Sequence, residues 1–262
     1  MTVDAAFLLA LAFKMGVTAA FVVLASFAAE RGGPLVGAMI ATLPISAGPA
    51  YVFLAFEHGS DFIAASALSS LVTNAATAVY ALAYAALAQR AGAFASIAGA
   101  LLVWCAAWFA TRGIEWTLAR ACGLTLVVFP VCLVLSSRFR HAPLRAPTRR
   151  WFDLPLRAGL VAILVLLVVV LSPYVGPALT GMLAVFPVVL TSLMVILHPR
   201  VGGRGAAAVI ANAISGLVGF ALALAALAAI PLGAFAAMAL ALAISIGWNV
   251  MVFTARRRGI PI

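Results

Sequence analysis

Long stretches of uncharged, apolar residues follow one another along almost the whole of this 262-residue chain. A helix of about 18 or more such residues can cross a bilayer core of roughly 30 Å. Hydrophobic residues make up 66% of the chain and charged residues 8%, more apolar surface than a soluble core of this size can hide. We therefore predict an all-α, polytopic membrane protein with nine transmembrane helices. The predicted spans are residues 5–29, 34–56, 62–88, 91–111, 121–137, 156–173, 177–198, 205–230 and 232–254.

An internal repeat organises these spans. The pattern of residues 11–44 recurs 143 positions later in the chain. Seven positions of the first copy have a counterpart in the second: Lys14 and Arg157, Gly16 and Gly159, Gly33 and Gly176, Pro34 and Pro177, Met39 and Met182, Ala41 and Ala184, and Pro44 and Pro187. A second block keeps the match with the offset changed by one, since Trp104, Phe109 and Arg112 correspond to Trp248, Phe253 and Arg256. Duplication of this kind is frequent among membrane transporters.

The repeat predicts three regions of the chain. A first four-helix repeat occupies residues 1–113, a linker helix and a basic cytoplasmic loop occupy 114–150, and a second four-helix repeat occupies 151–262. Five spans then precede the second repeat, and an odd number inverts it relative to the first. If segment 121–137 does not cross the membrane, eight spans remain and the repeats are parallel. Its seventeen uncharged residues favour a crossing, and hence inverted repeats.

The net charge of +10 comes from arginines in short loops between apolar spans. This placement is typical of cytoplasmic loops under the positive-inside rule and does not point to a nucleic-acid partner. With nine spans, twelve arginines lie on one side and two, Arg112 and Arg120, on the other. The N-terminus is then outside and the C-terminus cytoplasmic. Eight spans give the same division of charge, so charge does not choose between the two topologies.

Lys14 and Arg157 are the first candidate site residues, because a cation within hydrocarbon is costly and they occupy equivalent repeat positions. They could contact an anionic substrate. Alternatively, both side chains snorkel along their helices to the nearer interface.

Pro44 and Pro187 are the second candidates. Each lies ten residues into a predicted helix, where proline removes a backbone hydrogen bond and leaves carbonyl groups in need of partners. Ser46 near the first break, and Thr191 with Ser192 after the second, could contact a substrate or satisfy the freed backbone. An ordinary proline kink is the alternative in both helices.

Asn74 and Asn212 are the third candidates, since an amide in hydrocarbon must find a partner. The partner is either a neighbouring helix or a solute in a pore. By contrast, all six acidic residues fall at or beyond helix ends, and the three histidines have no spaced partner. We therefore expect no metal, no cofactor and no enzymatic activity.

A family resemblance lies in two segments, each of which follows a basic residue and a Gly-Pro turn. They are GAMIATLPISAGPAYVFLAF and TGMLAVFPVVLTSLMVIL. Each half of the chain resembles the GlpM-type family of small bacterial inner-membrane proteins, as if two had fused. The resemblance implies four spans per unit, a bacterial inner membrane and an association with envelope or exopolysaccharide production. It implies no catalytic residues.

These observations predict a transporter or passive permease for a small anionic or neutral solute, in which the two repeats rock around the broken helices. The alternative is a non-transporting scaffold or accessory subunit of an envelope or exopolysaccharide system. The expected partners are the lipid bilayer and a small solute. The sequence leaves open whether the protein is a monomer or a homodimer.

Overall fold

The computed structural model describes residues 5–31, 47–141 and 150–258, and the regular elements in these ranges are helices. This confirms the all-α class. The helices are α1 (Ala5–Arg31), α3 (Ala47–Glu57), α4 (Ser60–Leu87), α5 (Ala93–Thr111), α6 (Leu118–Ser136) with the short 3-10 helix η1 (Ser137–Phe139), α7 (Asp153–Ala184), α8 (Val188–Ala229) and α9 (Ala234–Arg257).

Five helical stretches in the described ranges are long and apolar enough to cross a bilayer, which indicates a multi-pass membrane protein. They are Ser60–Leu87, Ala93–Thr111, Leu118–Phe139, Asp153–Ala229 and Ala234–Arg257. The stretch Asp153–Ala229 has 77 residues and contains all of α7 and α8, far more than the roughly 20 residues of one crossing.

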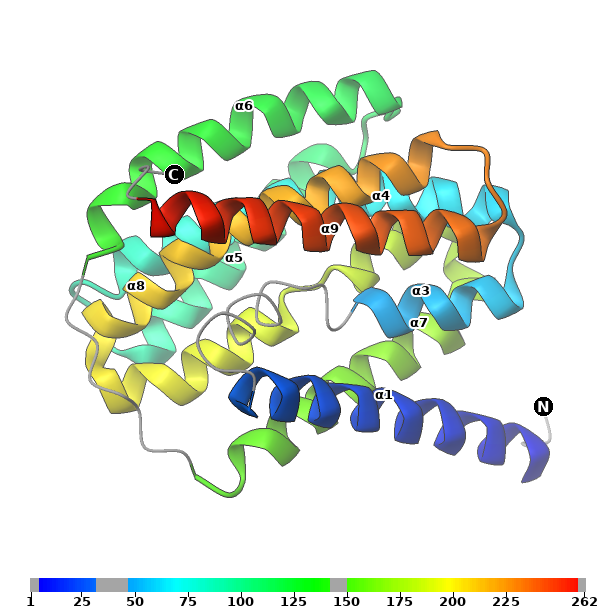
Figure 1. The fold of residues 1–262 in the computed structure, drawn as a ribbon, viewed down its shortest axis with the longest axis horizontal. Coiled ribbons are helices and arrows are strands. Elements are labelled where there is room, and N and C mark those ends of the chain that lie inside the picture. The colour runs from blue at the N-terminus through cyan, green and yellow to red at the C-terminus, as the bar shows by residue number, and fades with distance from the viewer. Residues whose placement is uncertain (1–4, 32–46, 142–149, 259–262) are drawn as a thin grey trace.

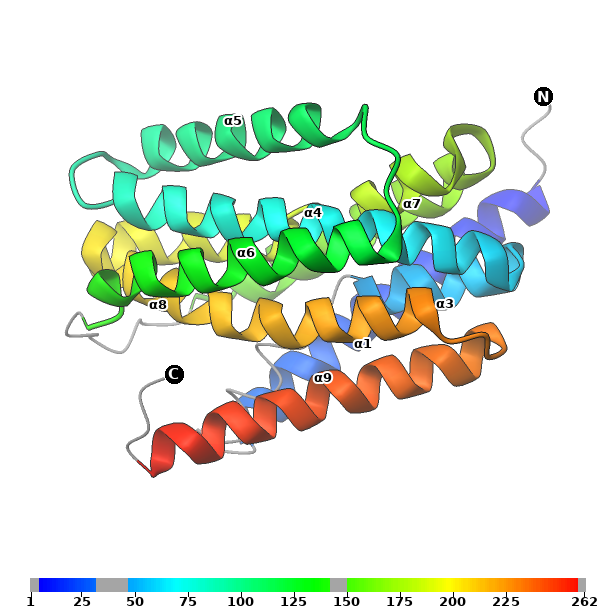
Figure 2. The same ribbon diagram turned by 90° about the horizontal axis from the view of Figure 1, so that it is seen from above.

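Helix α4 lies at the centre of the bundle, in contact with α5, α6, α7 and α8 (Figure 2). Two thirds of its apolar window, 67%, is buried inside the protein, compared with 17% for α5 and for α6. The outer helices therefore expose apolar side chains to the surroundings, as helices facing lipid do. Along the longest axis of the molecule, α1 begins at one end and α9 finishes at the other (Figure 1).

Two glycines divide α7 and α8 into shorter helices. Gly176 has φ 72° and Gly202 has φ 75°, values in the left-handed region that glycine adopts without strain. The pieces are residues 153–175, 177–184, 188–201 and 203–229. The predicted continuous helix 177–198 therefore differs from the structure, in which α7 ends at Ala184 and α8 begins at Val188.

Several predicted spans agree with observed helices to within a few residues: 62–88 with α4, 91–111 with α5, 121–137 with α6 and 232–254 with α9. Of the predicted span 34–56, residues 34–46 lie outside the described ranges and the remainder lies within α3.

Candidate functional site: a broken helix beside α4

Residues 177–201, here called the broken segment, run alongside α4 in the same direction. Before the break, the Ser70 hydroxyl of α4 donates to the Gly181 carbonyl at 2.7 Å. After the break, the Tyr80 hydroxyl is 2.7 Å from Thr191 Oγ1, and the Tyr84 hydroxyl is 2.9 Å from His198 Nδ1. The first two pairs are both 111 positions apart in the chain, so one register holds on both sides of the break. The two short helices therefore act as one interrupted rod packed along α4.

The interruption follows from Pro187, which has no N–H to donate and restricts the residue before it. The Val188 N–H bonds only as far back as the Phe186 carbonyl, at 2.7 Å, before the helix resumes with Thr191 N–H to the Pro187 carbonyl. The hydroxyl of Thr191 donates to that same Pro187 carbonyl at 2.6 Å, and the hydroxyl of Ser192 donates to Val189 at 2.8 Å. Both predicted hydroxyls thus satisfy backbone groups beside the break.

A row of hydrogen-bonded side chains on one face of α4 fastens it to α7 and α8; we call this row the polar seam. It consists of Ser70, Asn74, Tyr80 and Tyr84, all fully buried or nearly so. The Ser70 hydroxyl donates to the Gly181 carbonyl at 2.7 Å and the Asn74 amide to the Leu217 carbonyl at 2.9 Å. The Tyr80 hydroxyl is 2.7 Å from Thr191 Oγ1.

Sequence reasoning found only Asn74 of this seam and missed Ser70 and the two tyrosines, as well as His198, the partner of Tyr84. The signal was present, because Ser70, Asn74, Tyr80 and Tyr84 recur at intervals of four or six residues and share one face of a helix. A polar stripe in an otherwise apolar helix predicts a partner helix on that face.

Glycine permits close contact at both ends of the seam. A Cβ at Gly181 would overlap the backbone carbonyl of Ser66, and one at Gly203 would overlap the backbone carbonyl of Ala88. Backbone approach of this closeness is typical of small residues at helix interfaces in membranes. The half-helix 177–184 and the start of the half-helix 203–229 are therefore in close contact with α4.

Two buried polar atoms on α4 have no hydrogen-bond partner among the described residues: Ser66 Oγ and Asn74 Oδ1. Asn74 is 0% exposed, and the register of 111 positions puts it level with Val185, where the first half-helix has ended. An unpaired acceptor thus lies at the level where the segment is interrupted.

The predicted cations each have a carboxylate nearby. Lys14 of α1 forms an ion pair with Glu57, the last residue of α3. In the other half, Asp153 accepts two hydrogen bonds of 2.5 Å from the Arg200 guanidinium, and its charge also acts on Arg157, one helical turn away. Each pair links a long helix to the end of a shorter one, α1 to α3 and residues 153–175 to residues 188–201.

The remaining predicted site residues are divided between the two halves. Asn212 donates to the carbonyl of Ala208, one turn back on its own helix, at 2.9 Å, and to the carbonyl of Arg140 at 3.4 Å. It therefore contacts the region after α6 rather than the broken segment. Pro44 and Ser46 lie outside the described residues.

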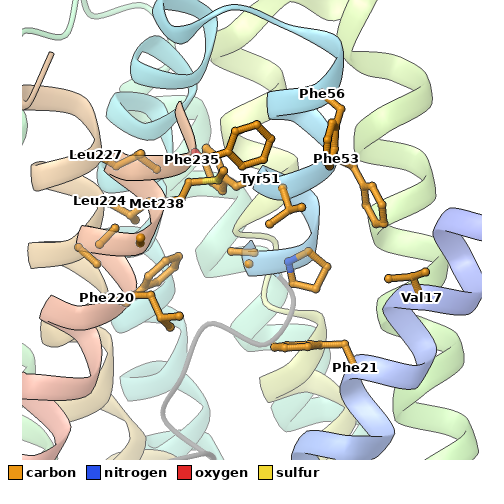
Figure 3. Close-up of a pocket in the computed structure, with 18 of the residues that line it drawn as sticks. Val17, Phe21, Tyr51, Phe53, Phe56, Phe220, Leu224, Leu227, Phe235 and Met238 are labelled. Atoms are coloured by element: carbon orange, nitrogen blue, oxygen red, sulfur yellow. The ribbon is translucent and has the colours of Figure 1, made fainter. Parts of the chain in front are cut away.

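A large apolar cavity of about 780 Å³ opens on the other face of α8, bounded by α1, α3, α8 and α9 (Figure 3). Seven of its twenty lining residues are aromatic, among them Phe21, Tyr51, Phe53, Phe220 and Phe235. Neither Lys14 nor Asn74 lines it. The cavity can accommodate an uncharged group of small-molecule size but offers a charged one little compensation.

No protein-family model, curated protein or solved structure matches this chain.

Proposed function

We propose that this protein is a membrane transporter or passive permease for a small solute, with the broken segment at its centre. The observation that carries the proposal is the interruption at residues 185–187, level with the buried Oδ1 of Asn74, which has no hydrogen-bond partner among the described residues. A helix interrupted within a bilayer leaves backbone groups that only protein, water or a bound solute can satisfy. Transporters use such discontinuous helices to form their binding sites.

The proposal includes nine crossings and two inverted repeats. A shift of 143 positions takes α3 onto residues 190–200, within the second half of the broken segment, and α4 onto residues 203–230, which match the last part of α8. The beginning of α1 and the end of α9 lie at opposite ends of the long axis, as an odd number of crossings requires (Figure 1). The two repeats would then rock against each other.

Among the predicted substrate classes, a neutral solute has the better support. Lys14 is paired with Glu57, and Asp153 lies beside both Arg157 and Arg200, so the cations proposed as anion contacts have carboxylates close by. The apolar lining of the cavity between α1 and α9 favours the same choice. An anionic solute would have to displace an existing ion pair.

A non-transporting scaffold is the second candidate, and one observation favours it. Asn74 is 0% exposed and donates to Leu217, so its surroundings are packed between α4 and α8. Buried polar side chains of this kind can hold the helices together by hydrogen bonds without any solute.

Reconstitution into liposomes separates the two candidates. We expect saturable flux of at least one member of a panel of radiolabelled small neutral and anionic solutes. Replacing the proline at the break, Pro187→Ala, should lower that flux by roughly tenfold, about 1.4 kcal/mol in the barrier. Pro173→Ala is the matched control, because Pro173 lies within α7 away from the break and is exposed.

Flux indistinguishable from empty liposomes across the panel, for protein that remains folded and monodisperse, would contradict transport and favour the scaffold. Equal flux in Pro187→Ala and the wild type would remove the break from the mechanism.

A further inference from the structure

A second cavity, of about 620 Å³, lies where α5 ends, between α4, α5 and the half-helix 177–184. The Trp104 indole donates to Thr77 Oγ1 at 3.2 Å, and since the two helices run in opposite directions, Arg112 is level with Ser69. This cavity is far more polar than the one between α1 and α9. Its polar lining comes from Ser69, Thr73, Trp108, Thr111, Arg112 and Trp116.

Two hydrogen-bond donors in this lining have no acceptor among the residues that the structure describes. The Arg112 guanidinium is exposed, and its contact is with the ring of Phe109, 4.7 Å from the ring centroid. The indole N–H of Trp108 likewise has no acceptor there, whereas those of Trp104 and Trp116 are bonded. A guanidinium and an indole N–H from residues that line one cavity can together recognise an anionic oxygen group.

The hydroxyl groups complete the site in a different way. Ser69 donates to the Ala178 carbonyl at 2.6 Å and Thr73 to the Ser69 carbonyl at 2.9 Å, so their protons are already engaged. Each hydroxyl oxygen keeps lone pairs that can accept a hydrogen bond. A ligand that combines a phosphate with a hydroxyl or ammonium donor matches this arrangement of donors and acceptors.

The corresponding arginine in the second half of the chain has a partner of its own. Arg256, which matches Arg112 in the repeat, donates to Ser215 Oγ at 3.0 Å. Ser215 corresponds to position 72, and there the first half carries Val72, which lines the cavity. Val72 has no hydroxyl group, so Arg112 lacks the hydrogen-bond acceptor that Ser215 provides to Arg256.

The surroundings of the cavity are those of a membrane–water interface. Trp108 and Trp116 are the residue type enriched at that level, and Phe109, 55% exposed, and Ile114 face outward beside them. A phospholipid head group reaches this level with its acyl chains along the apolar surface of α5, and a free phosphate reaches it from the water.

We propose that the cavity at Arg112 binds a phosphate group, held by the Arg112 guanidinium and the Trp108 indole. The site is independent of the proposed transport function, since a scaffold could carry it equally well.

The test uses the full-length protein, delipidated in an uncharged detergent and titrated with dioctanoyl phosphatidylglycerol, dioctanoyl phosphatidylcholine or inorganic phosphate. Calorimetry should give saturable binding for at least one of these probes. Binding of the lipids alone identifies a head group as the source of the phosphate, and binding of inorganic phosphate identifies a free anion. Either result supports the site, provided that Arg112→Gln weakens the affinity at least tenfold.

Arg120→Gln is the matched control, because Arg120 is also exposed near the same end of the bundle but donates to the Glu115 carbonyl and does not line the cavity. It should bind like the wild type. No saturable binding of any probe would overturn the proposal. So would an Arg112→Gln variant with wild-type affinity, or equal weakening by Arg120→Gln, which would indicate general surface charge.

Discussion

The two faces of α8 are held in contrasting ways. Toward α4, the polar seam and two glycine contacts fix the register of the helices through buried hydrogen bonds. Toward α1 and α3, the same helix borders an apolar cavity of about 780 Å³ (Figure 3). Hydrogen bonds are directional, and apolar contacts in a bilayer gain little over contact with lipid. We therefore expect the seam to hold the helices in a fixed register, and the helices around the cavity to move relative to one another more easily.

The largest expected effect follows from closing the space at the seam. Gly181→Ala places a methyl group on the Ser66 carbonyl, so α4 and the broken segment must separate, at a cost of about 3 kcal/mol in unfolding free energy. Thermal or denaturant unfolding of the purified protein measures this loss. Gly159→Ala, on α7 with nothing within 4 Å, is the control and should be nearly neutral. Equal stability of the two variants would mean that the helices are not in close contact.

A smaller loss than that of Gly181→Ala is expected for Asp153→Asn, because the Arg200 guanidinium keeps its charge while its carboxylate partner is removed. The same unfolding measurement applies. Asp61→Asn changes an exposed carboxylate in the first turn of α4 and should have a smaller effect. If the two variants unfold alike, the ion pair does not hold the end of the broken segment.

Tyr80→Phe removes one hydroxyl from the seam and leaves the ring in place. The bond to Thr191 is expected to contribute about 0.6 kcal/mol, the usual magnitude for an interhelical hydrogen bond in a membrane protein. Tyr174→Phe is the control, since Tyr174 is 70% exposed. A double-mutant cycle with Thr191→Val isolates the interaction, and a coupling energy of zero would contradict it.

The smallest change in stability is expected on the cavity side. Ala239→Leu adds volume to the cavity lining, where there is room, so unfolding should shift by less than about 0.5 kcal/mol. If the cavity takes part in transport, flux should fall in liposomes while stability is unchanged. Ala243→Leu, on the exposed surface of α9 and outside the lining, should alter neither. A loss of stability in Ala239→Leu comparable to that of Gly181→Ala would erase the contrast between the two faces.

The helices themselves were largely predictable from sequence, because uninterrupted apolar runs set the limits of α4, α5, α6 and α9 to within a few residues. Pro187 likewise predicted a disturbance at the right place. The degree of interruption was not predictable, since proline in a helix produces either a kink or a break according to the packing around it. The left-handed conformation of Gly202 was also not predicted, although it separates residues 188–201 from 203–229 between the predicted spans 177–198 and 205–230.

The partners of the candidate site residues needed three-dimensional information. Glu57 was placed correctly at a helix end, yet its pairing with Lys14 joins positions 43 residues apart. The seam joins α4 to residues more than 100 positions away, and no local pattern specifies such a register. What the sequence did contain was the need of Asn74 for a partner, which the Leu217 carbonyl fulfils.

The central claim is that the broken segment follows α4 in one register on both sides of its interruption. Disulfide cross-linking tests it in a variant whose Cys105, Cys122 and Cys132 are replaced by alanine. The pair Ser69→Cys with Ala178→Cys, before the break, and the pair Tyr84→Cys with His198→Cys, after it, should both cross-link under mild oxidation. The pair Ser69→Cys with His198→Cys should not. Cross-linking of the first pair without the second, or of the third pair, would contradict the account.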